Sequence, residues 1–194
     1  MTNSARGNQG AFRVRLLAPL DARITVADVL DCHDKCTERG LTFVKVSENG
    51  PLPFVDTSFD IVLCNSVIEH VTLPKSECRR LDIADTEWSQ QALRAQEAFA
   101  KEIHRVGKAY FVQTPHPSFP IDLHLWLPFT HWLGHRNVVR LSAVTSKYWI
   151  KQASEADWGL VSPNLLQCMF PNGRIHIERF LGMPKLIAYK PIDH

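Results

Sequence analysis

The stretch 52-LPFVDTSFDIVLCNSVIEHV-71 decides which fold this sequence can adopt. It opens with a proline turn, continues as a short apolar run and ends in asparagine, glutamate and histidine. The nearly continuous apolar run over 59–67 is typical of a strand that is covered on both faces. Because open α/β sheets bind ligands at the carboxyl ends of their strands, the polar end of this stretch predicts a functional site.

A helix and a second apolar strand follow this stretch. Asp85 or Thr86 can cap the start of the helix, and Gly107 can end it. Apolar residues recur along it at three- and four-residue steps: Trp88, Ala92, Ala95, Phe99, Ile103 and Val106. The run 109-AYFVQTP-115 reads as the next strand. Strand, helix and strand in this order predict a parallel crossover and therefore an α/β fold.

Two more strands are expected upstream, over 23-RITVADV-29 and 41-LTFVKV-46. Between them, 31-DCHDKC-36 offers two cysteines and a histidine, but a zinc site of this kind needs a second cluster at a defined spacing. We therefore expect a solvated loop there, and another over the polar segment 74–85. Carboxylate ligands are sparse around His116, His124, His131 and His135, so no metal site is predicted.

The sequence after Pro115 changes character and is rich in aromatic residues, prolines and histidines. It predicts short helices around 123–133 and 146–156. Ser162 and Pro163 then have the pattern of a helix start, and a turn is expected at 171–173. The last segment, 174-RIHIERFLGMPKLIAYK-190, has the alternation of an antiparallel hairpin.

Length and composition bound the class of protein. The 194 residues predict a flexible tail over 1–10 and a single domain over 11–194. The net charge of +2 is too small to indicate a nucleic acid or an anionic membrane as partner. Five cysteines favour a reduced, cytoplasmic protein, and no apolar run reaches the roughly 18 residues that span a bilayer. An exposed apolar face over 123–133 would favour a homodimer.

Three segments carry a resemblance to a known family: 52–71, 101-KEIHRVGKAYFVQTPHPSFPIDLHLWLPFTHWL-133 and 170-FPNGRIHIERFLGMPKLIAYK-190. They resemble class I S-adenosylmethionine-dependent methyltransferases of the small-molecule type, over roughly residues 23–191. The resemblance implies a Rossmann-like sheet, mostly parallel with a C-terminal antiparallel hairpin. It also implies transfer of a methyl group from S-adenosylmethionine to a small-molecule acceptor, with residues 116–160 as a lid on the acceptor side.

The resemblance assigns roles in cofactor binding to five residues that precede the predicted strand 59–67. Asp28 would hydrogen-bond the ribose hydroxyls, which suit a carboxylate with two oxygens. Ser47 or Glu48 would contact the adenine amino group, and Leu52 and Phe54 would flank the adenine face. From the residues alone, Asp28 could instead cap a following turn, and Glu48 could be an ordinary surface acid.

The resemblance also implies that residues at the end of the predicted strand 59–67 contact the reacting half of the cofactor. Asn65 and Ser66 would lie near the methionine half and the sulfonium, and His70 would face the acceptor. His70 could accept a proton from a hydroxyl or amine, because its ordinary pKa lies near neutrality. The alternative is that Glu69 and His70 only begin a helix, where the glutamate favours the helix dipole.

One feature of the family is missing. Its first strand leads into a glycine-rich D-x-G-x-G turn, and this sequence contains no such motif. We therefore expect the first strand of the sheet to be missing or replaced. Residues 11–20 could substitute for it, another chain could complete the sheet, or the sequence could begin downstream of the true start. The alternative function is a truncated, catalytically inactive relative that acts as a partner subunit.

Overall fold

The chain folds into two units, and each of them contains a pair of parallel strands. The computed structural model describes residues 22–118, 121–122, 127–128, 130–148, 156–180 and 183–192. Contacts divide the chain into two units, Met1–Pro53 and Phe54–His194. The predicted tail over 1–10 and the segment 11–20 lie outside the described residues. That residues 11–194 act as a single domain stays a prediction.

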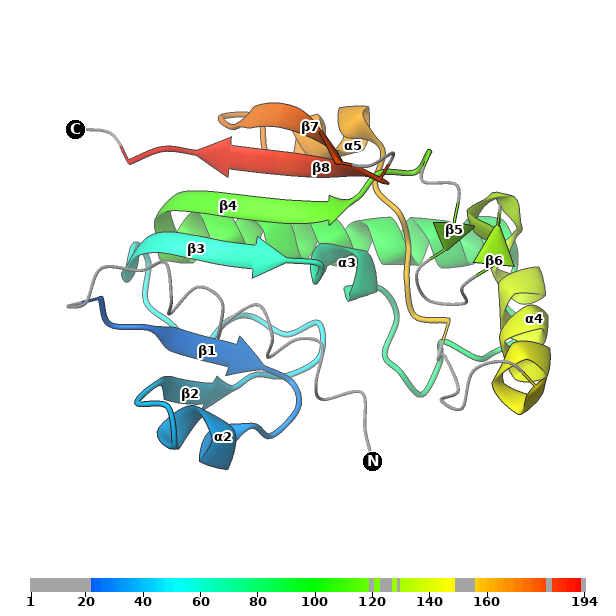
Figure 1. Ribbon diagram of the computed structural model, residues 1–194, viewed down its shortest axis with the longest axis horizontal. Helices are drawn as coiled ribbons and strands as arrows, with labels where there is room; N and C mark the ends of the chain where they lie inside the picture. Colours follow the sequence, from blue (N-terminus) through cyan, green and yellow to red (C-terminus); the bar gives the residue numbers. More distant parts are fainter. Residues whose placement is uncertain are drawn as a thin grey trace. The chain divides into compact units, whose positions relative to one another are not determined.

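The N-terminal unit is a small strand–helix–strand element. Strand β1 (Thr25–Asp28) pairs in parallel with β2 (Thr42–Lys45), and helix α2 (His33–Thr37) connects them (Figure 1). Its core is formed by four buried side chains: Val26, Cys32, Cys36 and Leu41. The prediction of a solvated loop over 31–36 is therefore wrong, because both cysteines of this segment act as small apolar core residues.

The C-terminal unit contains a four-stranded sheet in the order β3-β4-β8-β7. Strand β3 (Phe59–Asn65) is parallel to β4 (Gly107–Pro115). Strand β8 (Met183–Lys190) is antiparallel to both β4 and β7 (Arg174–Phe180). The crossover between β3 and β4 is helix α3 (Asp85–Val106), as the sequence predicts. The predicted mixed α/β class and the C-terminal hairpin are confirmed.

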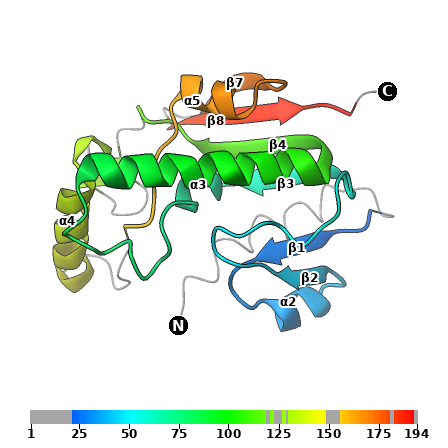
Figure 2. The same cartoon turned by 180° about the vertical axis from the view of Figure 1, so that it is seen from behind.

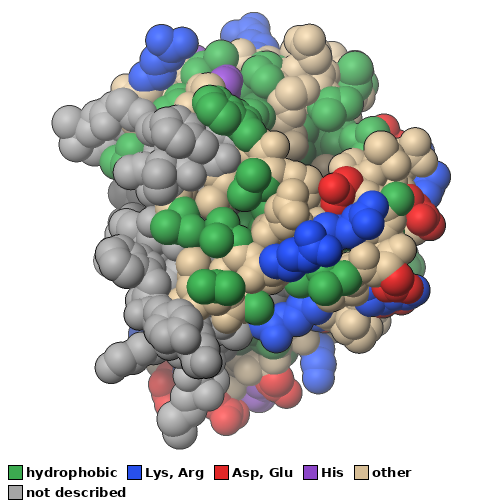
Figure 3. Space-filling view, turned by 90° about the vertical axis from the view of Figure 1, so that its right-hand side faces the viewer, with side chains coloured by type: hydrophobic (Ala, Val, Ile, Leu, Met, Phe, Trp, Pro, Cys, Tyr) green, Lys and Arg blue, Asp and Glu red, His purple; other side chains and the backbone are tan. Residues whose placement is uncertain are grey.

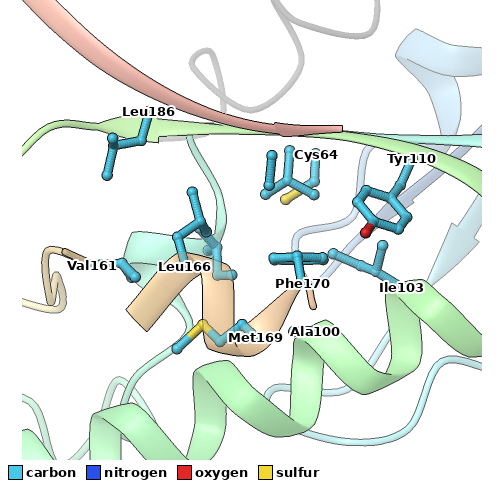
Figure 4. Close-up of a cluster of buried hydrophobic side chains, with 12 residues drawn as sticks. Cys64, Ala100, Ile103, Tyr110, Val161, Leu166, Met169, Phe170 and Leu186 are labelled. Atoms are coloured by element: carbon cyan, nitrogen blue, oxygen red, sulfur yellow. The ribbon is translucent and has the colours of Figure 1, made fainter. Parts of the chain in front are cut away.

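Helices α3 and α5 (Pro163–Met169) pack on the same face of this sheet (Figure 2). Figure 4 shows side chains of α5, α3 and the sheet converging in the core between them. The buried members of this cluster are Cys64, Ile68, Ala100, Ile103, Tyr110, Val112, Val161, Leu166, Met169, Phe170, Leu186 and Ala188. Alternation along β3 turns Val62 and Cys64 toward this core.

The other face of β3 differs from the prediction of a strand covered on both sides. The side chains of Ile61 and Leu63 are 58% and 43% exposed. They alternate with the core-facing Val62 and Cys64, so they project from the opposite face of the sheet. A continuous apolar sequence therefore did not imply burial on both faces in this strand.

The start of α3 is capped differently from the prediction. The residue before the helix is Ala84, and no side chain caps that end. The Asp85 carboxylate instead accepts a hydrogen bond of 2.9 Å from the backbone N–H of Arg136, in the first turn of α4 (His135–Tyr148). A Cβ atom at Gly134 would collide with the same carboxylate, which explains the glycine before α4. Asp85 thus caps a different helix, through a residue 51 positions further along the chain.

The described elements after β4 differ from the two helices that the sequence predicts there. Residues Ile121–Asp122 (β5) pair antiparallel with Leu127–Pro128 (β6), and a 3-10 turn, η2, covers Thr130–Trp132. The prediction of a helix around 123–133 is wrong for these described residues. Helix α4 (His135–Tyr148) overlaps the second predicted helix, around 146–156, only over residues 146–148, and the sequence did not predict its first eleven residues. Residues 149–155 of that prediction lie outside the described residues.

The segment 74–85 is a loop with mostly exposed residues up to the start of α3, as the sequence predicts, but two of its side chains are buried. Cys78 is fully buried and Ile83 is nearly so. Both pack in a cluster with Leu73, Trp88 and Ala92. Cys78 and Ile83 therefore attach this connection to α3 at two points.

The surface seen from the side of α4 mixes side chains of different kinds. Figure 3 shows hydrophobic side chains between Lys and Arg side chains on the described part of this face. Trp132, Leu133 and Val144 are among the exposed apolar residues, and Trp132 is 73% exposed. None of the described helices has the length and apolar character needed to cross a bilayer.

The turn between α5 and β7 depends on a glycine. The Ser162 hydroxyl accepts a hydrogen bond from Leu165 N–H and caps α5, as predicted. At Gly173, an added Cβ would lie 2.5 Å from the hydroxyl oxygen of Tyr110 and 3.3 Å from the carbonyl oxygen of Phe170. Tyr110 is 2% exposed and its ring contacts the rings of His104 and Phe170, so it has little room to move.

We expect Gly173→Ala to lower the free energy of unfolding by about 1–3 kcal/mol, because the new methyl group overpacks the core at Tyr110. Urea unfolding followed by circular dichroism measures this change. Gly159→Ala is the matched control, since its Cβ would meet its neighbours at 3.5 Å or more. Equal stabilities for the two variants would contradict the role given to Gly173.

Candidate functional site

The carboxyl ends of β3 and β4 lie side by side because these strands are parallel. Asn65 pairs with Gln113 in the strand register. The Gln113 side-chain amide donates a hydrogen bond of 2.8 Å to Asn65 Oδ1, and Ser66 N–H donates one of 2.8 Å to the Gln113 carbonyl. Ser66 has a φ of 52°, in the left-handed region that residues other than glycine rarely adopt. Such backbone strain clusters at functional sites.

A buried carboxylate follows these strand ends. Glu69 lies in the short 3-10 helix η1 (Ile68–His70) and is 1% exposed. Its Oε2 accepts a hydrogen bond of 3.0 Å from the hydroxyl of Thr114, which is fully buried in β4. A buried carboxylate requires hydrogen bonds to offset its loss of hydration. Glu69 therefore ties η1 to the neighbouring strand.

The one cysteine beside this site is not a nucleophile. Burial, together with the charge of Glu69, raises the pKa of the Cys64 thiol to about 12. A thiol in this state is protonated at neutral pH and unreactive. Cys64 belongs to the core under the site.

His70 is paired with a carboxylate from a distant part of the chain. Its Nδ1 lies 3.2 Å from Oδ1 of Asp157, and the two side chains are 36% and 17% exposed. Burial lowers the pKa of His70, but the hydrogen bond and charge of Asp157 outweigh it, so the pKa is raised above its ordinary value. A histidine with this partner can hold and release a proton near neutral pH.

Residues 156–161 bring Asp157 to this position and are fastened to η1 by backbone contacts. Gly159 N–H donates a hydrogen bond of 2.7 Å to the Glu69 carbonyl. The Gln96 side-chain amide of α3 donates to the carbonyls of both Ile68 and Gly159. The Thr72 hydroxyl donates to the backbone carbonyl of Asp157 at 2.8 Å. We call residues 156–161 the Asp157 segment.

A second histidine lies just beyond the carboxyl end of β4. His116 Nδ1 accepts hydrogen bonds from Ser118 N–H at 3.0 Å and from the Ser118 hydroxyl at 2.7 Å. Because the backbone N–H can only donate, the imidazole proton lies on Nε2. Burial and the charge of Arg179 lower the pKa of His116. His116 is therefore neutral at physiological pH and can donate a hydrogen bond.

The N-terminal unit places three of the predicted cofactor residues at one edge of its strand pair. Asp28 ends β1, while Ser47 and Glu48 follow β2, and Val46 N–H donates to the Asp28 carbonyl. Asp28 Oδ1 accepts a hydrogen bond of 2.9 Å from Leu30 N–H. The turn-capping alternative for Asp28 is thus present, and its contact with a ribose stays a prediction. Ser47 and Glu48 are exposed.

The remaining predicted residues are Leu52, which is half-buried in the N-terminal unit, and Phe54. Phe54 precedes the amino end of β3 and packs edge-to-face on Phe59, with ring centroids 4.8 Å apart. Arg105 donates a hydrogen bond of 2.7 Å to its carbonyl. Strand β3 spans about 20 Å, so the structure does not bring Phe54 together with Asn65, Ser66 and His70. The adenine contacts of Leu52 and Phe54 stay predictions.

Comparison with solved structures identifies this arrangement as a known fold. The chain is similar to a SAM-dependent methyltransferase from Aquifex aeolicus, with a TM-score of 0.54 and 11% sequence identity over 96% of this chain and 78% of that one. The fold is that of the Rossmann-like methyltransferases. At this identity the likeness establishes the fold alone.

Weaker likenesses extend to two further solved structures. The PH0226 protein from Pyrococcus horikoshii has a TM-score of 0.48 at 10% identity, over 98% of this chain and 92% of that one. The [4+2]-cyclase SpnF has a TM-score of 0.42 at 15% identity, over 96% and 72%. No protein-family model matches the sequence, and no curated protein matches it.

Sequence reasoning missed four members of the site: Gln96, Thr114, His116 and Asp157. Thr114 lies near the carboxyl end of β4, which is parallel to β3, and His116 follows that end, so the rule that selected Asn65 and Ser66 could have found them. Asp157 lies 87 residues from His70 along the chain, and no spacing pattern connects the two. Gln96 reads as one of several polar residues on a long amphipathic helix.

We expect Thr114→Val to lower the free energy of unfolding by about 1–3 kcal/mol, because the buried Glu69 carboxylate would lose a hydrogen-bond donor without a change in side-chain shape. Thermal or urea unfolding measures the loss. Thr114→Ser keeps the hydroxyl and serves as the control. A valine variant that is as stable as the serine variant would show that this bond does not anchor η1.

Proposed function

We propose that this protein transfers a methyl group from S-adenosylmethionine to a small-molecule acceptor. The observation that supports this proposal is the position of its polar groups. Asn65, Ser66, Glu69 and His70 follow β3 at the carboxyl end of a parallel pair. In doubly wound sheets this edge is where ligands bind, and the fold is shared with a SAM-dependent methyltransferase.

The two residues at the strand end have the chemistry expected for the methionine half of the cofactor. Asn65 Oδ1 already accepts a bond from Gln113, which directs the side-chain NH2 group of Asn65 away from β4. Both Asn65 and Ser66 are exposed. An amide NH2 group and a hydroxyl can donate hydrogen bonds to the carboxylate of the methionine half.

The groups proposed for the adenosine half precede β3 in the sequence. In this proposal Asp28 accepts hydrogen bonds from the ribose hydroxyls, and Ser47 or Glu48 accepts one from the adenine amino group. Leu52 and Phe54 contribute apolar contacts to the adenine. The cofactor would have to bind without the glycine-rich turn, which is absent from the sequence.

Little chemistry is required of the protein once both molecules are bound. The sulfonium releases a neutral thioether, which is a good leaving group. Alignment of the acceptor atom with the methyl carbon therefore accounts for much of the rate enhancement. Asn65 and Ser66 would hold the donor, and His70 would take a proton from the acceptor where one is lost. The acceptor side would be formed by residues of the 116–160 region.

The absence of the glycine-rich turn favours one alternative function, a methyltransferase-like partner subunit without cofactor. The discriminating measurement is a calorimetric titration of the 194-residue chain with S-adenosylhomocysteine, together with its mass in solution. We expect micromolar binding. A folded chain that does not bind would contradict the proposed enzyme and support the alternative.

We expect Asp28→Asn to weaken this binding at least tenfold, about 1.4 kcal/mol, because the ribose hydroxyls lose a charged acceptor. Asparagine keeps the side-chain oxygen that caps the turn at Leu30, so the stability of the fold should not change. Calorimetry with S-adenosylhomocysteine measures the affinity, and thermal unfolding checks the fold.

The control for this variant is Asp31→Asn. Asp31 caps the neighbouring turn in the same way, with Oδ1 accepting a bond of 3.1 Å from His33 N–H, and it is given no role in binding. Wild-type affinity in the Asp28→Asn protein would exclude the ribose contact. An equal loss in both variants would point to a general effect of charge instead.

A further inference from the structure

We propose that Asp157 is a positioning residue that makes His70 the base for a hydroxyl acceptor, an alcohol or a phenol. This inference rests on the proposed methyl transfer and names the acceptor class for it. The inference starts from one contact between distant parts of the chain. Nδ1 of His70 and Oδ1 of Asp157 lie 3.2 Å apart, although the two residues are 87 positions apart in the sequence.

The pairing selects one form of the imidazole. An ionised carboxylate can only accept a hydrogen bond, so the neutral His70 carries its proton on Nδ1 and donates it to Asp157. The lone pair is then on Nε2. The side chain of His70 is 36% exposed, against 17% for Asp157, so the imidazole is the more accessible member of the pair.

The hydrogen bonds around Asp157 hold it in place. Its carbonyl accepts the Thr72 hydroxyl at 2.8 Å, and two residues further on Gly159 N–H binds the Glu69 carbonyl at 2.7 Å. Gln96 Nε2 bridges the carbonyls of Ile68 and Gly159 at 3.2 and 2.8 Å. The Asp157 segment and η1 are thus joined directly on both sides of the pair, which fixes the orientation of the imidazole before an acceptor arrives.

The charged groups around His70 support the same assignment. Asp157 and Glu69 both favour the protonated imidazole, whereas burial and Lys75 oppose it. The balance stabilises the imidazolium that forms when His70 accepts a proton. The arrangement follows the general pattern in which a carboxylate orients a histidine base and stabilises its charged form.

The need for a base indicates the acceptor class. Carboxylic acids and aromatic thiols such as thiophenol are largely ionised near neutral pH, so they require no base. A neutral alcohol or phenol must lose its proton as the new bond forms, whereas a neutral amine attacks through its own lone pair and loses its proton only afterwards. The acceptor oxygen would bond to the methyl carbon while the carbon–sulfur bond breaks, and the O–H proton would pass to Nε2 of His70. The products are a methyl ether and S-adenosylhomocysteine, and the proton leaves His70 for solvent.

The experiment combines a set of acceptors with two variants. Wild-type protein is incubated with S-adenosylmethionine and with phenols, alcohols, benzoate or thiophenol, and the methylated products are identified by mass spectrometry. We expect methylation among the phenols and alcohols only. Asp157→Asn should lower kcat at least tenfold without changing the affinity for S-adenosylhomocysteine, and His70→Gln should lower it at least as much.

The pH dependence separates positioning from a structural role. A base must be deprotonated to act, so the rate rises with pH through the pKa of His70. Because Asp157 raises that pKa, the rising limb of the Asp157→Asn profile should shift to lower pH while its plateau falls. Nuclear magnetic resonance of the His70 imidazole, assigned with His70→Gln, should show the same downward shift without any acceptor present.

The control is Asp60→Asn, which removes a surface carboxylate paired with Lys108 at 2.7 Å and should change neither the pH profile nor kcat.

An Asp157→Asn protein with unchanged titration of His70 and an unchanged rate would overturn the pairing. Methylation of benzoate or thiophenol, or of no hydroxyl compound by a protein that binds S-adenosylhomocysteine, would overturn the acceptor class. A protein that does not bind S-adenosylhomocysteine refutes the proposed function itself.

Discussion

The parallel pairing of β3 with β4 is the constraint on which the candidate site depends. It requires a long crossover, which α3 provides, and it brings the carboxyl ends of both strands to one edge. Asn65 then faces Gln113, and Glu69 reaches the hydroxyl of Thr114. An antiparallel pairing would have placed the end of one strand beside the start of the other and separated these groups.

Burial of polar groups explains why the loops after these strands are ordered. Glu69 is 1% exposed and Thr114 is fully buried, and unpaired groups at such sites would be costly. Hydrogen bonds from Thr114, Gln96 and Gly159 therefore connect β4, α3 and the Asp157 segment to η1. The same bonds that satisfy these groups place Asp157 beside His70, so the local stability and the proposed chemistry depend on one network.

The fold of Rossmann-like methyltransferases is present here without the glycine-rich turn that usually follows their first strand. Each unit keeps a parallel pair, β1 with β2 and β3 with β4, and polar or acidic residues follow the carboxyl ends in both. Asp28 has a structural role at the end of β1, since one of its oxygens caps the turn at Leu30.

The sequence by itself determined the elements whose signals are local. Repeated apolar residues from Trp88 to Val106 specify a helix wherever it packs, Ser162 and Pro163 start α5, and alternation over 174–190 specifies a hairpin. The position of Asn65, Ser66 and His70 at a strand end followed from the same rules. These features depend on residues within one or two turns of each other, so a single sequence contains them in full.

Only the tertiary structure decided the contacts between distant segments. Asp85 caps α4 and not its own helix, because the free N–H groups of α4 lie within reach in space. Cys32, Cys36 and Cys78 are core residues because apolar neighbours from other elements cover them. Asp157 pairs with His70 for the same reason, since a hydrogen bond depends on proximity in space and not on spacing along the chain.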